Sequence, residues 1–169
     1  MRIGQSMIPE FDAEMANTRK VLERLPDDKL DWKIHEKSNT IGWVANHLAD
    51  IPGWMDMTIN KDSLDVDPPG GEPFRSPSLG TAAEILVLFD DNVAKARPIL
   101  ESVEDATLME DWSLLKGGEE IMTLPKLVVV RTWIFNHSIH HRAHLCVYFR
   151  VNDVPVPGLY GPSADDAGI

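Results

Sequence analysis

The sequence predicts an all-α fold, a four-helix bundle with a long loop between the second and third helices and an extended C-terminal tail. Two observations support this prediction. Signals for β-strands are weak, because only residues 119–123 and 111–115, around Gly117 and Gly118, could pair briefly. Apolar side chains recur at helical spacing in four long segments, residues 5–25, 38–60, 81–102 and 124–151.

The first two helices have recognisable ends. Apolar residues such as Met7, Phe11 and Leu22 lie on one face of the first helix, and Pro26 follows its end. The second helix starts at the cap cluster Ser38-Asn39-Thr40 and runs to about residue 60. Pro52 lies inside it and predicts a kink, because proline lacks the backbone N–H of a helical residue.

Proline and glycine mark the irregular parts of the chain. They are frequent in residues 61–80, which we expect to form a long loop of the kind that is often functional or mobile. The third helix, residues 81–102, follows this loop. After the fourth helix, residues 155–162 contain three prolines and two glycines, so the tail cannot be helical and should lie extended over the body.

Composition and charge exclude several classes of partner. The 169 residues fit one domain spanning 1–169, and 16 basic against 27 acidic residues give a net charge of −11. This balance argues against nucleic acid and anionic membranes as partners. No apolar run approaches the ~20 residues that span a bilayer, and the first residues do not resemble a secretory signal. With Cys146 as the single cysteine, we expect a cytoplasmic protein.

Four of the six histidines fall within residues 136–145, inside the fourth predicted helix. At about 100° per residue, His137 and His141 lie about 40° apart on or beside the apolar stripe, whereas His140 and His144 lie on its flank. The predicted stripe comprises Leu127, Val130, Ile134, Ser138, His141, Leu145 and Tyr148.

The pair His137 and His141 has the spacing by which helices often hold zinc or another transition metal. Ser138 follows the first histidine where a zinc protease has glutamate, which excludes that class. His47, at the edge of the second helix's apolar stripe, is the candidate third ligand, and Asp50 could support an imidazole or act as a weaker ligand. The alternative is a pair of core-edge histidines hydrogen-bonded to Tyr148 or to a carboxylate.

Other notable side chains have structural interpretations. Cys146 is expected to be a packed small hydrophobe, and Arg142 is expected to pair with a carboxylate, although it could also steer an anionic substrate. The tryptophans are interpreted as core or subunit-contact residues; they are Trp32, Trp43, Trp54, Trp112 and Trp133.

Three short blocks give the chain a family resemblance. They are Ile41-Gly42-Trp43-Val44-Ala45-Asn46-His47-Leu48-Ala49-Asp50, His137-x3-His141-Arg142 and Val156-Pro157-Gly158-Leu159-Tyr160-Gly161-Pro162-Ser163. In order and spacing these blocks, with Leu30-Asp31-Trp32-Lys33 before them, resemble the DinB-like (YfiT-like) metalloenzymes over nearly the whole chain.

The resemblance implies a four-helix bundle, often a homodimer, with nickel or zinc held by three histidines from two helices. Residue by residue, these histidines correspond to His47, His137 and His141. The family often has glutamine two residues after its arginine, whereas this chain has His144, so a fourth imidazole could join the site.

Three functional hypotheses follow. The leading one is a metal-dependent S-transferase that joins a small cellular thiol, such as bacillithiol or mycothiol, to a small electrophile, as the resemblance implies for some relatives. Residues 62–80 and the tail around Tyr160 are the candidate rim of its pocket. The second is a metal-dependent hydrolase of a small substrate. The third is a non-catalytic binding or stress protein with a structural metal. The family's name refers to DNA-damage induction and implies no binding to DNA.

Overall fold

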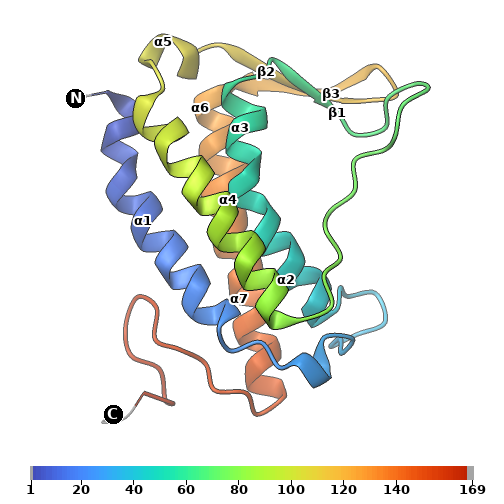
Figure 1. Ribbon diagram of the computed structural model, residues 1–169, viewed down its shortest axis with the longest axis vertical. Coiled ribbons are helices and arrows are strands. Elements are labelled where there is room, and N and C mark those ends of the chain that lie inside the picture. The colour runs from blue at the N-terminus through green and yellow to red at the C-terminus, as the bar shows by residue number, and fades with distance from the viewer. Residues whose placement is uncertain (1, 167–169) are drawn as a thin grey trace.

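Long helices run side by side and a small sheet lies across one end of them in the computed structural model, which describes residues 2–166 (Figure 1). The long helices are α1 (Ile3–Leu22), α2 (Ile41–Asp50), α4 (Ala82–Ser102) and α7 (His137–Val151). The shorter helical elements are η1 (Asp27–Lys29), η2 (Ile51–Gly53), α3 (Trp54–Ile59), α5 (Asp105–Leu108), α6 (Lys126–Val129) and η3 (Val130–Asn136). The strands are β1 (Ser63–Asp65), β2 (Asp111–Lys116) and β3 (Glu119–Pro125).

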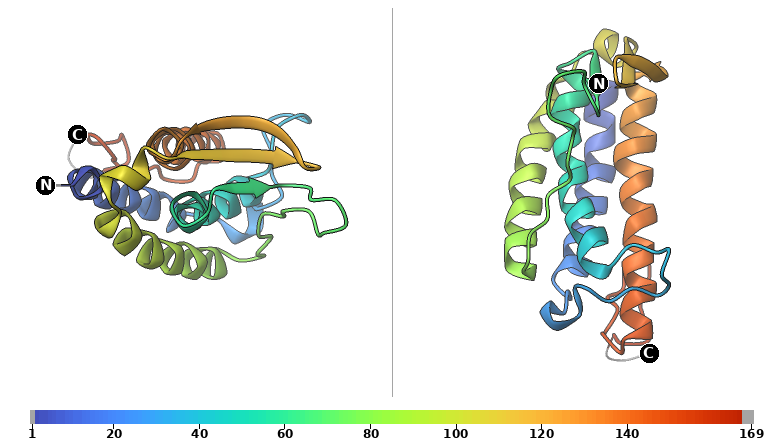
Figure 2. Two further views of the ribbon diagram at one scale, coloured as in Figure 1. Left: turned by 90° about the horizontal axis from the view of Figure 1, so that it is seen from above. Right: turned by 90° about the vertical axis from the view of Figure 1, so that its right-hand side faces the viewer.

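The core lies between the long helices. Helix α1 packs against α4 and α7, and α2 packs against the same two helices. Figure 2 shows this arrangement from above and from the side. Each helix contributes apolar side chains to the core, because their apolar residues recur with the helical period. Fully buried examples are Phe11, Leu22, Ile41, Leu48, Ile85, Phe89, Leu100, Ile134, Phe135 and Phe149.

Two of the predicted helix starts are confirmed in atomic detail. Thr40 caps α2 by accepting a hydrogen bond from the Trp43 backbone N–H, 3.1 Å from the hydroxyl. Thr81 caps α4 in the same way for Glu84. A capping hydroxyl satisfies a donor that has no partner inside the helix, which is why threonine fixes these starts.

The second and fourth predicted helices are each interrupted. At Pro52 the second helix passes through the 3₁₀ turn η2, which confirms the predicted kink. The fourth contains the π-helical segment η3, which advances through less rotation per residue than an α-helix. The predicted stripe is therefore incomplete: Val130, Ile134 and Ser138 are buried as expected, but the structure also buries Phe135, Arg142 and Phe149.

The all-α prediction is wrong, because the fold is mixed α/β. Strand β2 pairs with β3 in an antiparallel hairpin and with β1 in parallel. Gly117 and Gly118 form the hairpin turn, both with positive φ, as a two-residue type I′ turn requires. The hairpin was foreseen as a brief pairing. Strand β1 was not: it lies in the segment predicted to be loop and spans only three residues.

The tail behaves as predicted. Residues 154–166 form neither helix nor strand, and Val154, Val156 and Leu159 pack against the core. Across residues 2–166 the structure contains no helix with the length and apolar character that membrane crossing requires.

Candidate metal centre

Two facing rows of aromatic side chains form the candidate metal centre. On one side, the helical spacing of four residues lines up Trp133, His137 and His141 along η3 and α7. On the other side, His47 lies between the indole rings of Trp43 and Trp54. The His47 ring centroid lies 5.0 Å from that of His137 and 4.6 Å from that of His141. Contacts between α2 and α7 thus unite residues ninety positions apart.

The three imidazoles point the same nitrogen at one another. The His137 Nε2 atom lies 2.8 Å from the Nε2 of His47 and 3.0 Å from the Nε2 of His141. A neutral imidazole nitrogen carries either one proton or one lone pair. His137 Nε2 cannot therefore make two ordinary hydrogen bonds, one to each neighbour. A cation that accepts all three lone pairs fits this arrangement, and the three residues form a possible metal-binding cluster.

The opposite ring nitrogens do not support the hydrogen-bonded alternative. The Nδ1 atoms of His47 and His141 are buried and have no hydrogen-bond partner within the described part of the chain. Buried polar atoms are normally paired, so each unpaired one requires an explanation. Neither Tyr148 nor a carboxylate satisfies these histidines among residues 2–166.

Burial keeps the cluster neutral. Desolvation, with a smaller effect of the neighbouring His137, lowers the pKa of His47 to about 4. Desolvation also lowers the pKa of His141 to about 3, together with the four surrounding imidazoles. The pKa of His137 is lowered for the same first reason. The imidazoles thus have free lone pairs near neutral pH, the form in which histidine binds a metal.

Asp50 and His144 have different neighbours from those proposed for them. Asp50 accepts a hydrogen bond from the Trp54 indole N–H at 3.0 Å, and burial raises the pKa of its carboxyl group. His144 belongs to a second group with His140 and His141, whose ligand atoms also lie within 4.8 Å of one another. His141 is thus shared between the two groups, and His144 is not part of the group containing His47.

Comparison with known proteins identifies the family. The family model of the DinB superfamily matches residues 10–145. The chain belongs to the DinB superfamily.

Individual DinB relatives resemble the whole chain. YrdA of Bacillus subtilis (strain 168) is 26% identical over 161 residues, which cover 93% of this chain and 86% of YrdA. The crystal structure of a DinB-like protein, YjoA of Bacillus subtilis, has a TM-score of 0.70 at 16% identity and covers 94% of this chain and 99% of its own. A DinB-like protein from Bacillus cereus ATCC 10987 has a TM-score of 0.67 at 22% identity, covering 91% and 95%. At these identities the two structures establish the fold alone.

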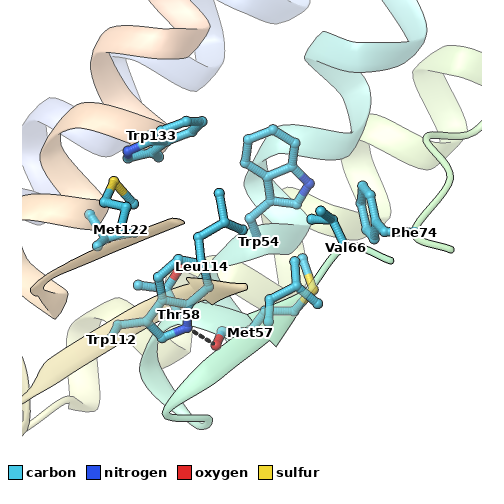
Figure 3. Close-up of a pocket in the computed structure, with 11 residues that line it drawn as sticks. Trp54, Met57, Thr58, Val66, Phe74, Trp112, Leu114, Met122 and Trp133 are labelled. Carbon is cyan, nitrogen blue, oxygen red and sulfur yellow. Dashed lines mark hydrogen bonds between the residues drawn. The ribbon is translucent and has the colours of Figure 1, made fainter. Parts of the chain in front are cut away.

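An apolar pocket adjoins the histidine cluster of this DinB protein (Figure 3). Its volume is about 140 Å³. Helical elements supply one wall of the pocket. The sheet, together with the loop that follows β1, supplies the other wall. The lining residues are Trp54, Met57, Thr58, Leu64, Val66, Phe74, Trp112, Leu114, Met122, Val129 and Trp133. The segment 62–80, predicted as a pocket rim, therefore contributes Leu64, Val66 and Phe74.

The site has a polar side as well. A groove runs past Trp43, whose indole stacks on His47 with ring centroids 4.7 Å apart. Asp31, Asn46 and Arg75 are among the residues that line the groove. The histidine cluster therefore has an apolar pocket beyond Trp54 and a polar groove beyond Trp43.

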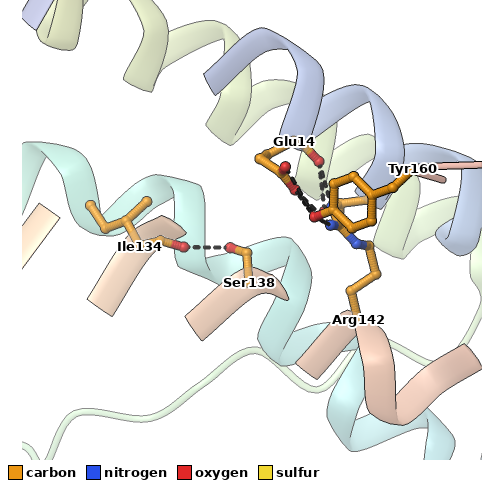
Figure 4. Close-up of polar contacts among 6 residues, drawn as sticks. Glu14, Ile134, Ser138, Arg142 and Tyr160 are labelled. Carbon is orange, nitrogen blue, oxygen red and sulfur yellow. Dashed lines mark hydrogen bonds and ion pairs between the residues drawn. The ribbon is translucent and has the colours of Figure 1, made fainter. Parts of the chain in front are cut away.

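Arg142 pairs with a carboxylate, as predicted, and this carboxylate is that of Glu14 on α1 (Figure 4). The buried guanidinium donates to the Glu14 carboxylate, the Glu14 carbonyl, the Thr18 hydroxyl and the Tyr160 hydroxyl. Tyr160 in turn donates to the Glu14 carboxylate at 2.8 Å. Tyr160 thus anchors the tail to α1 and α7. The tail around Tyr160 was a candidate for the rim of the reactant pocket, and Tyr160 is not among the residues that line the apolar pocket.

The tryptophans were interpreted as core or subunit-contact residues, yet three of them contact the histidines. Trp133 stacks on His137 with ring centroids 5.8 Å apart, and Trp54 lies 5.6 Å from His137. The available signal was the spacing of four residues between Trp43 and His47 and between Trp133 and His137. Cys146 packs against the core as predicted, and burial raises the pKa of its thiol.

Proposed function

We propose that this DinB-superfamily protein is a metal-dependent enzyme in which His47, His137 and His141 hold a divalent ion, nickel or zinc. The observation that carries the proposal is the approach of three Nε2 atoms, since His137 Nε2 cannot make an ordinary hydrogen bond to both of its neighbours. Nitrogen ligands suit both ions. Three protein ligands leave a coordination position for a reactant, as catalytic sites require.

The proposed reaction is S-transfer from a small thiol, of the bacillithiol or mycothiol type, to a small electrophile. A divalent ion lowers the pKa of a thiol that binds to it and so supplies a nucleophile near neutral pH. The thiol proton passes to water, the sulfur forms a bond to the electrophilic carbon, and the leaving group departs with the bonding electrons.

The protein's own residues hold and shield the reactants in this scheme. The neutral imidazoles of the cluster offer lone pairs and no competing charge, since burial lowers the pKa of each. Trp43 and Trp54 cover the two sides of the His47 ring and restrict water there. Cys146 is unsuited to serve as the nucleophile, because burial raises the pKa of its thiol. The thiol in this proposal is therefore an external one.

The same cluster would also suit a metal-dependent hydrolase, since a divalent ion activates water by the same lowering of pKa. Assays of one preparation separate the two reactions. Conjugation of bacillithiol, mycothiol or cysteine to monochlorobimane supports the transferase, and cleavage of 4-nitrophenyl esters without thiol supports the hydrolase. Neither activity in protein loaded with its metal would favour a structural metal in a non-catalytic protein.

The proposed partners are the two small molecules and a second copy of the chain. The homodimer is a proposal from the family resemblance, and light scattering with size-exclusion chromatography tests it. The small thiol is tested by the conjugation assay above.

Elemental analysis of the protein as purified tests the metal itself. We expect close to one nickel or zinc ion per chain, with His47→Ala, His137→Ala and His141→Ala losing most of it. His35→Ala is the matched control, because His35 is an exposed histidine that belongs to neither histidine group. Wild-type protein that neither contains nor takes up a divalent ion contradicts the proposal, as does full metal content in His137→Ala.

A further inference from the structure

We infer that the apolar pocket beyond Trp54 binds an uncharged apolar group of the substrate, about the size of one benzene ring. The substrate role rests on the proposed function, since the group would belong to the electrophile that reacts at the histidine cluster. Binding of the group to the pocket requires no metal, so the two ideas can fail separately.

The pocket offers a ligand almost no polar surface. Of the three indole N–H groups among the lining residues, two are already used within the protein. The Trp112 Nε1 donates to the Met57 carbonyl at 3.0 Å, as Figure 3 shows, and the Trp54 Nε1 donates to Asp50. These rings therefore present carbon faces to the cavity. A charged or strongly polar group would lose its hydration there without compensation, which selects against it.

The volume of the pocket limits the size of its ligand. An engineered apolar cavity of about 150 Å³ in another protein stays free of water and binds benzene. This pocket, at about 140 Å³, has nearly the same volume and a lining of aromatic, aliphatic and methionine side chains. A single six-membered ring or a short branched alkyl group matches this space.

The position of the pocket connects it to the histidine cluster. Trp54 and Trp133 both line the pocket, and both rings contact the ring of His137. Trp54 also contacts His47, with ring centroids 5.3 Å apart. A group bound between the sheet and these two indoles therefore lies next to the rings that contact the ring of His137. A reactive carbon attached to this group could reach the converging Nε2 atoms.

The electrophile suits this pocket better than the thiol does. Small cellular thiols of the proposed kind carry sugar and carboxylate groups, which need polar partners. Such partners line the separate groove past Trp43, with Asp31 and Arg75. The two sides of the cluster thus differ in polarity in the way that two chemically different reactants require.

Fluorine NMR with fluorobenzene as the probe tests the pocket directly in metal-free protein. We expect saturable binding to the wild type and binding weaker by about tenfold or more in Leu114→Phe, whose larger ring fills the cavity. Val66→Phe, in the loop after β1, is a second filling variant that does not alter the hairpin β2–β3. Ile121→Phe is the matched control, because Ile121 is exposed on β3 and does not line the pocket. The charged analogue 4-fluorobenzoate should not bind.

Addition of Co²⁺, a paramagnetic ion, then tests the connection to the cluster. We expect it to broaden the resonance of bound fluorobenzene in the wild type and not in His137→Ala. Absent binding, or binding that both filling variants retain, overturns the inference. If Co²⁺ binds at the histidines without broadening the resonance, the pocket does not adjoin the site and the substrate role is wrong. If Co²⁺ does not bind while fluorobenzene binds as expected, the apolar pocket is supported and the metal proposal alone fails.

Discussion

Two polar clusters lie on neighbouring faces of α7, and they differ in whether the protein itself satisfies their hydrogen-bonding groups. In the Arg142 cluster, a guanidinium, a carboxylate and two hydroxyl groups pair donors with acceptors. In the histidine cluster, three ring nitrogens converge and two Nδ1 atoms have no partner among residues 2–166. The first cluster is complete as a structural unit, whereas the second has the unsatisfied ring nitrogens of a possible metal-binding site.

The comparison also distinguishes residues that are adjacent in sequence. His141 and Arg142 are consecutive, but their side chains point about 100° apart, toward α2 and α1 respectively. A substitution in one cluster should therefore leave the other nearly unchanged. Stability should depend mainly on the Arg142 cluster, and metal binding on the histidine cluster.

The largest expected effect is that of Arg142→Met, which keeps much of the side-chain volume and leaves the buried Glu14 carboxylate without its cation. Breaking a buried pair in this way costs about 3–5 kcal/mol of unfolding free energy. Urea denaturation measures it. Arg150 lies on the same helix as Arg142 and forms an exposed ion pair with Asp165 of the tail, so Arg150→Met should cost less than about 1 kcal/mol. Equal losses in the two variants would contradict a structural role specific to Arg142.

The next largest effect is the stabilisation of the folded state by metal. At a free Zn²⁺ or Ni²⁺ concentration one hundred times the dissociation constant, binding raises the unfolding free energy by about 2.7 kcal/mol. We expect this increase in the wild type and in His35→Ala, and its absence in His137→Ala. Thermal unfolding with and without added metal measures it. An equal increase in His137→Ala would show that the ion binds elsewhere, for example at His140 and His144.

A third effect is the acid sensitivity of the metal-free protein. In the folded state the pKa of His47 is lowered to about 4 and that of His141 to about 3, whereas the pKa of histidine in the unfolded chain stays near its ordinary value of 6.5. Between pH 6.5 and about 4 the unfolded chain therefore binds more protons, so stability is present above this window and falls as the pH decreases through it.

Unfolding of EDTA-treated protein at about pH 7.5 and about pH 5 measures this loss. The groups that face the two imidazoles are His137, His140, His144 and the indole-bound Asp50. His141→Ala should lose less stability than the wild type over this interval, and His35→Ala should lose as much. A wild-type protein no more acid-sensitive than His141→Ala would contradict the burial of neutral imidazoles.

The parts of this molecule that sequence predicts are those encoded by local spacing. Residues about one helical turn apart determine the caps at Thr40 and Thr81, the kink at Pro52 and the four-residue step from His137 to His141. His47 was reached through the apolar stripe of its own helix and the family resemblance. Local spacing thus selected His137 and His141, the resemblance supported His47, and the fold brings the three together.

The features that sequence missed depend on distant partners. Strand β1 has three residues and pairs in parallel with β2, with Ser63 opposite Ser113, so its own sequence carries little signal. The π-helical turns of η3 change the helical phase that places Phe135 and Arg142 in the core. The apolar pocket combines both omissions, since the sheet forms one of its walls and Trp133 of η3 contributes to another.

The smallest expected effect is that of Tyr160→Phe, which removes only the hydroxyl that links Arg142 and Glu14 to the tail. We expect a loss of about 1 kcal/mol of unfolding free energy, since the hydrogen bonds of the hydroxyl with Arg142 and Glu14 are lost but lie near solvent. Tyr148→Phe is the matched control, because no hydrogen bond of the Tyr148 hydroxyl is found within residues 2–166. Metal affinity should be the same in both variants. If Tyr160→Phe instead weakened metal binding, the tail would belong to the functional site, and the separation of the two clusters would be wrong.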